Sequence, residues 1–176
     1  MPEVDLTTDP RHAPSVDEAA AAPWTHRLDW LGTLARLVLG AVMVVAGALK
    51  VTHPGESARA VQAYQLLPYE VSKLVGYGLP LLEIIIGALL LLGLLTRGAA
   101  VITTLLMAAF VIGIASAWAR GLSIDCGCFG GGGTIDKAAT AYPLELARDT
   151  ALLLTGAYLC WRPRSALSLD RRWYGH

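Results

Sequence analysis

The chain has 176 residues, of which 55% are hydrophobic and only 16% are charged, and its mean hydropathy is +0.51. This length suits a single domain, but the composition is too apolar for an ordinary soluble protein. The formal net charge is zero and no basic patch stands out, so nucleic acid is excluded as an expected partner.

The N-terminal segment, residues 1–27, is polar and acidic and contains several prolines and the alanine run Ala19–Ala22. Such a segment cannot bury enough apolar surface to fold alone, so we expect a disordered cytoplasmic tail. A short amphipathic helix over Val16–Ala22 is the alternative. The residues after Met1 lack the apolar stretch of a signal peptide, so we expect no cleavable one.

Four apolar segments fill the central domain, residues 28–161, and each is about as long as the roughly 20 residues that cross a bilayer as a helix. A soluble four-helix bundle would show a polar stripe on each helix, and the third segment has none. The fourth carries Glu145, Arg148 and Asp149 in its first two turns. The sequence therefore predicts an all-α fold, an integral membrane four-helix bundle. The expected spans are Leu28–Leu49, Leu74–Leu95, Ala99–Ala119 and Pro143–Trp161.

The segments between the spans are short. Ser57–Leu67 has apolar and polar residues spaced as in a helix that lies at the membrane surface, and Pro68 would end it. A tight turn at Thr96–Gly98 joins the second and third spans. Residues 162–176 form a basic tail, which we expect in the cytoplasm.

The orientation in the membrane is predicted from lysine and arginine, which favour the cytoplasmic side. With the N-terminus inside, the inner segments hold slightly more of these residues than the outer ones, and four arginines cluster after the last span. We therefore expect a multi-pass protein of a bacterial plasma membrane. Both termini would be cytoplasmic, and the loop before the fourth span would be extracytoplasmic.

Two charged residues fall inside the expected spans. Arg36 lies about two turns into the first and Glu83 near the middle of the second. A charge at the centre of a spanning helix costs about 2.5–3.5 kcal/mol, so both should face the bundle interior. Small residues share their helix faces, which lets two backbones approach closely. The two faces are Arg36, Gly40, Met43 and Gly47, and Gly76, Pro80, Glu83 and Gly87.

Glu83 has two interpretations. It is half of a structural ion pair with Arg36, Arg148 or Lys50, or it carries protons or binds a quinone-like molecule. A direct pair between Glu83 and Arg36 is less favoured, because at 1.5 Å per residue the two side chains lie at different depths in the bilayer. We favour the structural pair and keep Glu83, Arg36 and Lys50 as candidate cofactor-binding residues.

The segment Ser123–Gly133 contains Cys126 and Cys128, which are separated by one glycine and followed by a run of glycines. Two thiols this close can form a disulfide only with local strain, and a strained, exposed disulfide is usually a labile one. We therefore expect a redox-active pair at the water boundary, where disulfides persist.

Two alternatives remain for this loop. One is a permanent disulfide that shapes it. The other is a metal site of Cys126, Cys128 and either His53 or Asp125, but structural zinc normally takes four ligands, so we expect no metal. The third cysteine, Cys160, lies a bilayer away and is expected to be a buried core thiol.

Several motifs together resemble a known family. They are G-A-L-K-V (Gly47–Val51), Y-Q-L-L-P (Tyr64–Pro68), L-P-L-L-E-I-I-I-G (Leu79–Gly87), the L-G-L-L-T-R end of the second span and D-C-G-C-F-G (Asp125–Gly130). In this order they are similar to the MauE/DoxX group of small bacterial membrane proteins. The Cys-Gly-Cys-Phe-Gly loop is closest to the methylamine-utilisation MauE branch.

The resemblance implies a four-helix membrane protein. MauE is thought to help mature the disulfide-rich small subunit of methylamine dehydrogenase, and DoxX relatives are linked to thiol or sulfur redox chemistry. Carried over, Cys126 and Cys128 would be the catalytic redox pair, and Glu83 and Lys50 the family's polar positions in or beside the membrane. The implied partners are the lipid bilayer and an extracytoplasmic thioredoxin-like or disulfide-containing protein.

Three functional hypotheses follow. The first is a thiol–disulfide oxidoreductase that passes electrons between that partner and the membrane, with a quinone as a candidate acceptor. The second is a non-catalytic assembly or scaffold subunit whose loop disulfide only holds shape. The third is a small-solute carrier coupled through Glu83, for which four spans would have to associate into a homo-oligomer.

Overall fold

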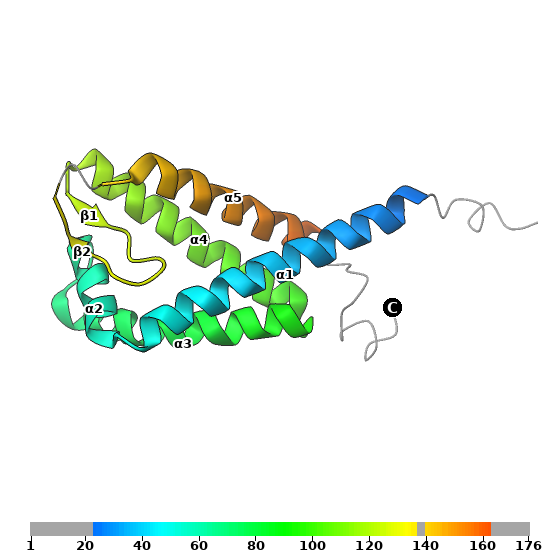
Figure 1. Ribbon diagram of the computed structural model, residues 1–176, viewed down its shortest axis with the longest axis horizontal. Coiled ribbons are helices and arrows are strands. Elements are labelled where there is room, and N and C mark those ends of the chain that lie inside the picture. The colour runs from blue at the N-terminus through cyan, green and yellow to red at the C-terminus, as the bar shows by residue number, and fades with distance from the viewer. Residues whose placement is uncertain (1–22, 137–139, 163–176) are drawn as a thin grey trace, which may run out of the picture.

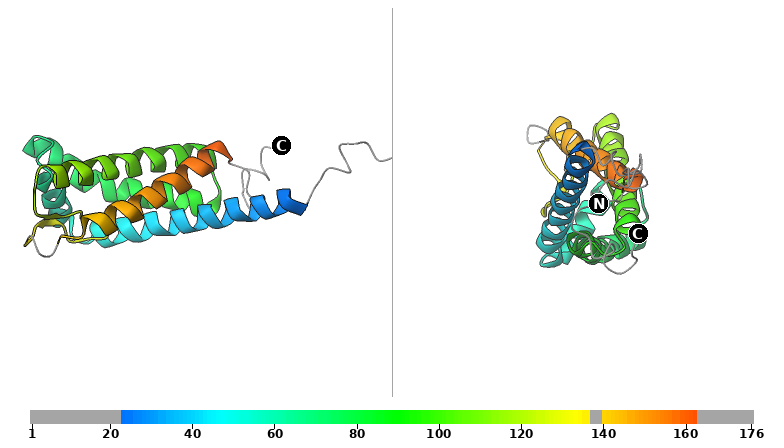
Figure 2. Two further views of the ribbon diagram at one scale, coloured as in Figure 1. Left: turned by 90° about the horizontal axis from the view of Figure 1, so that it is seen from above. Right: turned by 90° about the vertical axis from the view of Figure 1, so that its right-hand side faces the viewer.

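The structure is a computed structural model that describes residues 23–136 and 140–162. Residues 1–22 of the predicted N-terminal tail (1–27) and residues 163–176 of the predicted C-terminal tail (162–176) lie outside this part, whereas residues 23–27, expected to be disordered, belong to helix α1. Within it, helices α1 (Pro23–Val51), α3 (Tyr69–Leu92), α4 (Thr96–Ala119) and α5 (Tyr142–Trp161) form an elongated bundle. Helix α1 begins five residues before the expected domain boundary and projects beyond the other helices (Figures 1 and 2).

Helices α1 and α3 pack closely along the two glycine faces that the sequence predicts. A Cβ atom added to Gly40 would lie 2.9 Å from the carbonyl oxygen of Gly87, and one added to Gly87 would lie 2.8 Å from that of Gly40. One added to Gly47 would lie 2.6 Å from the carbonyl oxygen of Pro80. Because no side chain fits in these gaps, glycine is what allows the two helices to approach so closely.

Helix α2 (Pro54–Ala63) crosses the end of this pair. It starts three residues earlier than expected, with Pro54 in its first turn, where the missing N–H costs no helical bond. It ends four residues before the expected Leu67, and Gln65 beyond it takes a positive φ of 52°. Gly76 of α3 lies directly under it, because an added Cβ there would be 2.4 Å from the Cα of Ala58.

The turn between α3 and α4 also differs from the prediction. Helix α3 ends at Leu92 because Gly93 adopts the left-handed conformation (φ 68°), with its N–H bonded to the carbonyls of Leu89 and Leu90. Thr96–Gly98, the expected turn, is instead the first turn of α4. Helix α5 then returns alongside α4, where an added Cβ at Gly156 would lie 2.6 Å from Thr104 Oγ1.

Three helices in the described part are long and apolar enough to cross a membrane: Asp29–Val51, Tyr69–Leu92 and Thr96–Ala119. Only 33–39% of each is buried within the chain, so large apolar faces remain for lipid or another chain to cover. Helix α5, the expected fourth span, is not among the three. It does form a helix over nearly the predicted residues, Tyr142–Trp161.

The cysteine segment closes one end of the bundle. Strands β1 (Ile124–Asp125) and β2 (Gly133–Thr134) form a two-stranded antiparallel hairpin, with Ile124 opposite Thr134. The hairpin and α2 lie at the same end, and the loop between the strands turns back toward the helices (Figure 1). The start of α1 and the end of α5 lie at the opposite end (Figure 2).

Candidate functional site: the cysteine loop

The loop is fixed to the bundle by tyrosine hydroxyls. Tyr142 donates a hydrogen bond to the carbonyl of Leu122 (2.7 Å) and accepts one from the N–H of Ile124 (3.1 Å). Tyr64 donates to the carbonyl oxygen of Cys126 (3.1 Å). Burial raises the pKa of Tyr64, so its hydroxyl stays protonated and able to donate. The backbone on both sides of the first cysteine is thus held in place.

Glycine is required where the loop bends and where it touches α2. Gly127, between the two cysteines, has φ 69°, a left-handed conformation that other residues rarely adopt. Gly132 has φ 95°, and a Cβ there would lie 2.4 Å from the Cβ of Ala60. The glycines that the sequence places around the cysteines therefore allow a tight loop that packs against α2.

Cys126 and Cys128 are buried free thiols, 8% and 7% exposed. The sequence predicts an exposed pair, so this is a correction. Its reason is that the loop folds inward and places both residues in a core cluster with Ile114, Ile124 and Tyr142. The adjacent Phe129, 37% exposed, lies nearer the surface.

The sulfur of Cys126 has two nitrogen donors beside it. The backbone N–H of Cys128 lies 3.4 Å from Cys126 Sγ, and a guanidinium nitrogen of Arg148 lies 3.6 Å away. The pKa of the Cys126 thiol is lowered mainly by a hydrogen bond from the Cys128 side chain, and further by these two donors, against the opposing effect of burial. Of the two sulfurs, Cys126 is therefore the one whose surroundings favour the thiolate.

The sulfur of Cys128 lies in different surroundings. Its thiol donates to Oδ2 of Asp149 at 3.6 Å. The hydrogen bond to Cys126 and burial both raise the pKa of Cys128, so this thiol keeps its proton. The surroundings thus favour the thiolate at Cys126 and the protonated thiol at Cys128, which suits attack by one sulfur and later closure by the other.

Arg148 and Asp149 on α5 complete the site. Arg148 Nε donates to Asp149 Oδ1 at 2.8 Å, and the guanidinium also lies 4.8 Å from the centre of the Phe129 ring. The sequence shows the charges at the start of α5, but it does not predict that they face the cysteines. The signal available was their placement in the first two turns after the loop, on a helix that otherwise looks membrane-spanning.

Glu83 and Lys50 form an ion pair deeper in the bundle. Lys50 Nζ lies 2.6 and 2.8 Å from the two carboxylate oxygens of Glu83, and both side chains are buried. Of the three partners expected for Glu83, Lys50 is the one found in contact with it. Arg36 is also buried, but it precedes Lys50 by 14 residues on α1, roughly 21 Å along the axis.

A small cavity connects this pair to the cysteine loop. It measures about 10 Å³, enough for about one water molecule, and its lining includes Glu83, Cys128, Phe129 and Asp149. Lys50 and Arg36 are not among the residues that line this cavity, and Arg36 is too far along α1 to contact Lys50. The quinone role of Glu83, Arg36 and Lys50 stays a prediction.

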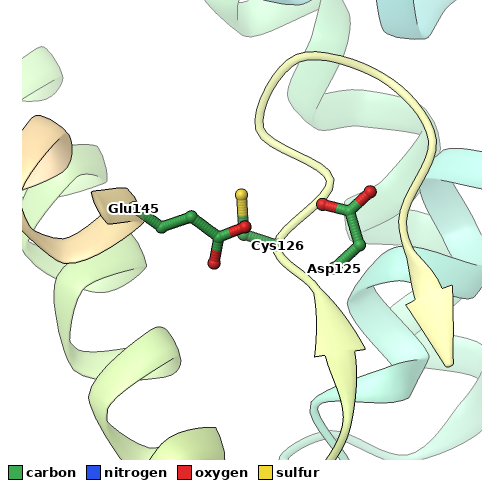
Figure 3. Close-up of side chains that lie close together, drawn as sticks. All are labelled: Asp125, Cys126 and Glu145. Carbon is green, nitrogen blue, oxygen red and sulfur yellow. The ribbon is translucent and has the colours of Figure 1, made fainter. Parts of the chain in front are cut away.

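Figure 3 shows a second arrangement around Cys126. Glu145 reaches toward it from α5, and Asp125 precedes it on β1. The ligand atoms of these three residues lie within 4.8 Å of one another, close enough to hold a metal ion. This group shares Cys126 and Asp125 with the metal site considered from the sequence, but it contains Glu145 in place of Cys128. The guanidinium of Arg148, 3.6 Å from the same sulfur, is a fixed positive charge that disfavours a cation there.

Cys160 is remote from this site and is only partly buried. It packs at the edge of the core cluster formed by Leu39, Ile86 and Leu159, with its sulfur 3.6 Å from Thr104 Oγ1. The expected core position is thus found, with less burial than predicted.

Comparison with known proteins gives one match. The family described as methylamine utilisation protein MauE matches residues 28–162, which is most of the chain. No curated protein and no solved structure matches it.

Proposed function

The chain belongs to the MauE family, and from this membership and the chemistry of its cysteine loop we propose that this membrane protein exchanges disulfides through Cys126 and Cys128. The partner would be an extracytoplasmic thioredoxin-like or disulfide-containing protein, as in the maturation of a disulfide-rich enzyme subunit. The observation that carries the proposal is a thiolate-stabilising pair of donors, the Cys128 N–H and Arg148, around one sulfur of a two-cysteine loop.

The surroundings of the pair favour exchange over a purely structural disulfide. A thiolate is the reactive form of cysteine, and a cation beside the sulfur raises its share. The left-handed Gly127 gives the backbone between the two sulfurs a freedom that other residues lack. A disulfide that only shapes the loop does not require a guanidinium beside one of its sulfurs.

We further propose that α5 is the fourth span, with the cysteine loop outside and both chain ends in the cytoplasm. The loop lies at the end of the bundle away from the start of α1 and the end of α5, which suits an even number of crossings (Figure 2). Labelling of intact cells with a membrane-impermeant maleimide tests this. The cysteine loop should be labelled in a Cys160→Ser background, and labelling only after the cells are opened would reverse the orientation.

Redox titration of the purified protein tests the exchange function. After equilibration in mixtures of reduced and oxidised dithiothreitol, free thiols are counted by the gel shift of a maleimide-coupled polymer. We expect three labels on the reduced protein and one, on Cys160, on the oxidised protein. The Cys160→Ser variant is the control and should change from two labels to none. A protein that keeps every label across all mixtures would refute the proposal.

A non-catalytic assembly role is the second candidate, favoured by the burial of both cysteines. The two candidates differ in the effect of replacing Cys126 and Cys128 by serine together. An assembly role predicts that protein level and partner maturation fall in parallel. The exchange role predicts a normal protein level with lost maturation.

A further inference from the structure

Asp149 is a buried carboxylate that faces a thiol. It is 2% exposed, and its Oδ2 lies 3.6 Å from Cys128 Sγ. Its other oxygen, Oδ1, accepts from Arg148 Nε at 2.8 Å. Arg148 thus occupies Oδ1, and Oδ2 is the oxygen that faces the thiol. Asp149 lies on α5, 21 residues beyond Cys128.

The ionisable groups around Asp149 and Cys128 come from several elements. Arg148 and Glu145 share α5 with Asp149, Cys126 belongs to the loop, and Tyr64 follows α2. Glu83 lines the same water-sized cavity as Cys128 and Asp149, and its charge is matched by Lys50 of α1. Among these described groups, Asp149 is the carboxylate whose oxygen accepts from the Cys128 thiol.

The geometry points to a division of roles in which Cys126 attacks the partner and Asp149 is the base that removes the proton from Cys128 for the closing step. This inference rests on the proposed exchange function. It names the order in which the two sulfurs react and a catalytic residue outside the loop.

The exchange proceeds in two balanced steps. The Cys126 thiolate attacks one sulfur of the partner's disulfide, so that bond breaks, a mixed disulfide forms and one partner thiolate leaves. The proton of Cys128 then moves to Asp149 while Cys128 attacks Cys126 Sγ. The mixed disulfide breaks, the Cys126–Cys128 bond forms and the second partner thiolate leaves. The two sulfurs of this chain are oxidised by two electrons and the partner's two sulfurs are reduced. The one proton released, that of Cys128, passes from Asp149 to one partner thiolate, and the other partner sulfur leaves as a thiolate.

This division of roles explains why the two sulfurs have different neighbours. Cys126 has two donors within 3.6 Å, which suit an attacking thiolate, while the Glu145 carboxylate lies within 4.8 Å of its sulfur. Cys128 has an acceptor beside it, which suits a thiol that must lose its proton later. Its single proton has two acceptors within reach, Cys126 and Asp149. Once Cys126 is bound in a mixed disulfide, its sulfur is no longer a thiolate, and Asp149 is the acceptor that remains.

The test uses the full chain carrying Cys160→Ser, in detergent, with 4,4′-dithiodipyridine as the disulfide. The first release of thiopyridone reports attack by Cys126, and the second reports closure by Cys128. General-base assistance typically contributes 10²–10⁴-fold, so Asp149→Asn should slow the second release about 100-fold at pH 7 and leave the first unchanged. Asp149→Glu should restore part of the rate. Asp29→Asn, at the far end of the bundle, is the matched control and should change neither.

The pH profile separates a base from a merely structural residue. With Asp149 present, the second release should depend weakly on pH between 6 and 8. With asparagine, it should rise about tenfold per pH unit, as for an unassisted thiol below its pKa. A faster first release in Asp149→Asn would show that this variant does not fold. The pH profile of the wild-type protein then decides alone. A wild-type second release whose rate rises tenfold per pH unit overturns the inference. A wild-type protein without any second release would refute the exchange function itself. A normal second release in Asp149→Asn refutes only the role of Asp149.

Discussion

Two clusters of charged side chains lie close together and differ in their contacts: the Lys50–Glu83 pair is buried, and the cluster at the cysteine loop includes the half-buried Arg148. In the bundle, Lys50 and Glu83 satisfy each other, with both carboxylate oxygens within 2.8 Å of one ammonium. At the loop, Arg148 divides its contacts between Asp149 at 2.8 Å and Cys126 at 3.6 Å, and Asp149 also accepts from Cys128. The first is a closed pair that holds two helices together. The second includes sulfur atoms whose protonation and bonding can change, and this is what separates a structural contact from a reactive one.

Breaking the closed pair should have the largest effect. Removing one member of a buried ion pair leaves the other uncompensated and costs about 3–5 kcal/mol, so Glu83→Leu should strongly destabilise the protein. Lys50→Met added to it should recover most of the loss, because no charge then remains buried. Thermal unfolding in detergent, followed by tryptophan fluorescence, measures both.

Glu56→Ala is the control for that experiment, because its 4.0 Å contact with Arg59 lies on the exposed face of α2 and should contribute at most about 1 kcal/mol. A double variant that is stable but has lost disulfide exchange would break the comparison. It would show that the pair serves the cysteine chemistry as well as the fold.

Changing the packing of the loop should have an intermediate effect. Gly132→Ala places a methyl group against Ala60 and should destabilise the loop by about 1–3 kcal/mol, exposing Cys126 and speeding its alkylation. Gly133→Ala is the matched control. It has the same kind of positive φ (118°), but nothing lies within 4 Å of its added Cβ. Alkylation followed by mass spectrometry compares the two.

Ala60→Gly combined with Gly132→Ala sharpens that experiment, because it removes the 2.4 Å contact with the Ala60 Cβ and leaves the backbone strain and a 3.0 Å contact with the Gly127 Cα. The alkylation rate should then fall toward that of Gly133→Ala. Equal rates for Gly132→Ala and Gly133→Ala in the first place would mean that contact with α2 does not hold the loop.

Removing the shared cation should have the smallest effect. The pKa of Cys126 is lowered first by its hydrogen bond with Cys128 and only in part by Arg148. Arg148→Gln should therefore raise the pKa of Cys126 moderately. Alkylation slows as the pH falls through the pKa of a thiol, because the thiolate is the reactive form, so this decline should begin at a higher pH in the variant.

Iodoacetamide labelling of Cys126 between pH 5 and pH 9 measures that shift. Arg59→Gln, an exposed arginine on α2, is the control and should follow the wild-type curve. A curve for Arg148→Gln that moves to lower pH would contradict the role assigned to the guanidinium.

The helices and the contact between α1 and α3 were predictable because they depend on local patterns. The spacing of Gly40 and Gly47 on one helix and Gly87 on the other indicated which faces meet, and the structure confirms it. Membership of the MauE family was likewise predictable from ordered motifs. Helix ends were less predictable, because the end of α3 before Gly93 depends on one residue taking a left-handed conformation.

The residues that surround the two cysteines were not predictable in the same way. Whether Arg148 and Asp149 face the cysteines depends on the rotation of α5 about its axis, and the charges at its start indicated only a weak span. The burial of Cys126 depends on contacts between the loop, α2 and α5, which no local pattern encodes. The sequence indicated reactive thiols but not the residues that control them.

The burial of the two sulfurs has a consequence for selectivity. With 8% and 7% of their surfaces exposed, they offer little to glutathione or to stray oxidants that meet the protein by diffusion. A protein that docks on the hairpin and displaces the glycine segment would therefore react with these sulfurs faster than a small molecule does. Discrimination between electron donors would then come from steric shielding, and the reduction potential would set only the direction of the exchange.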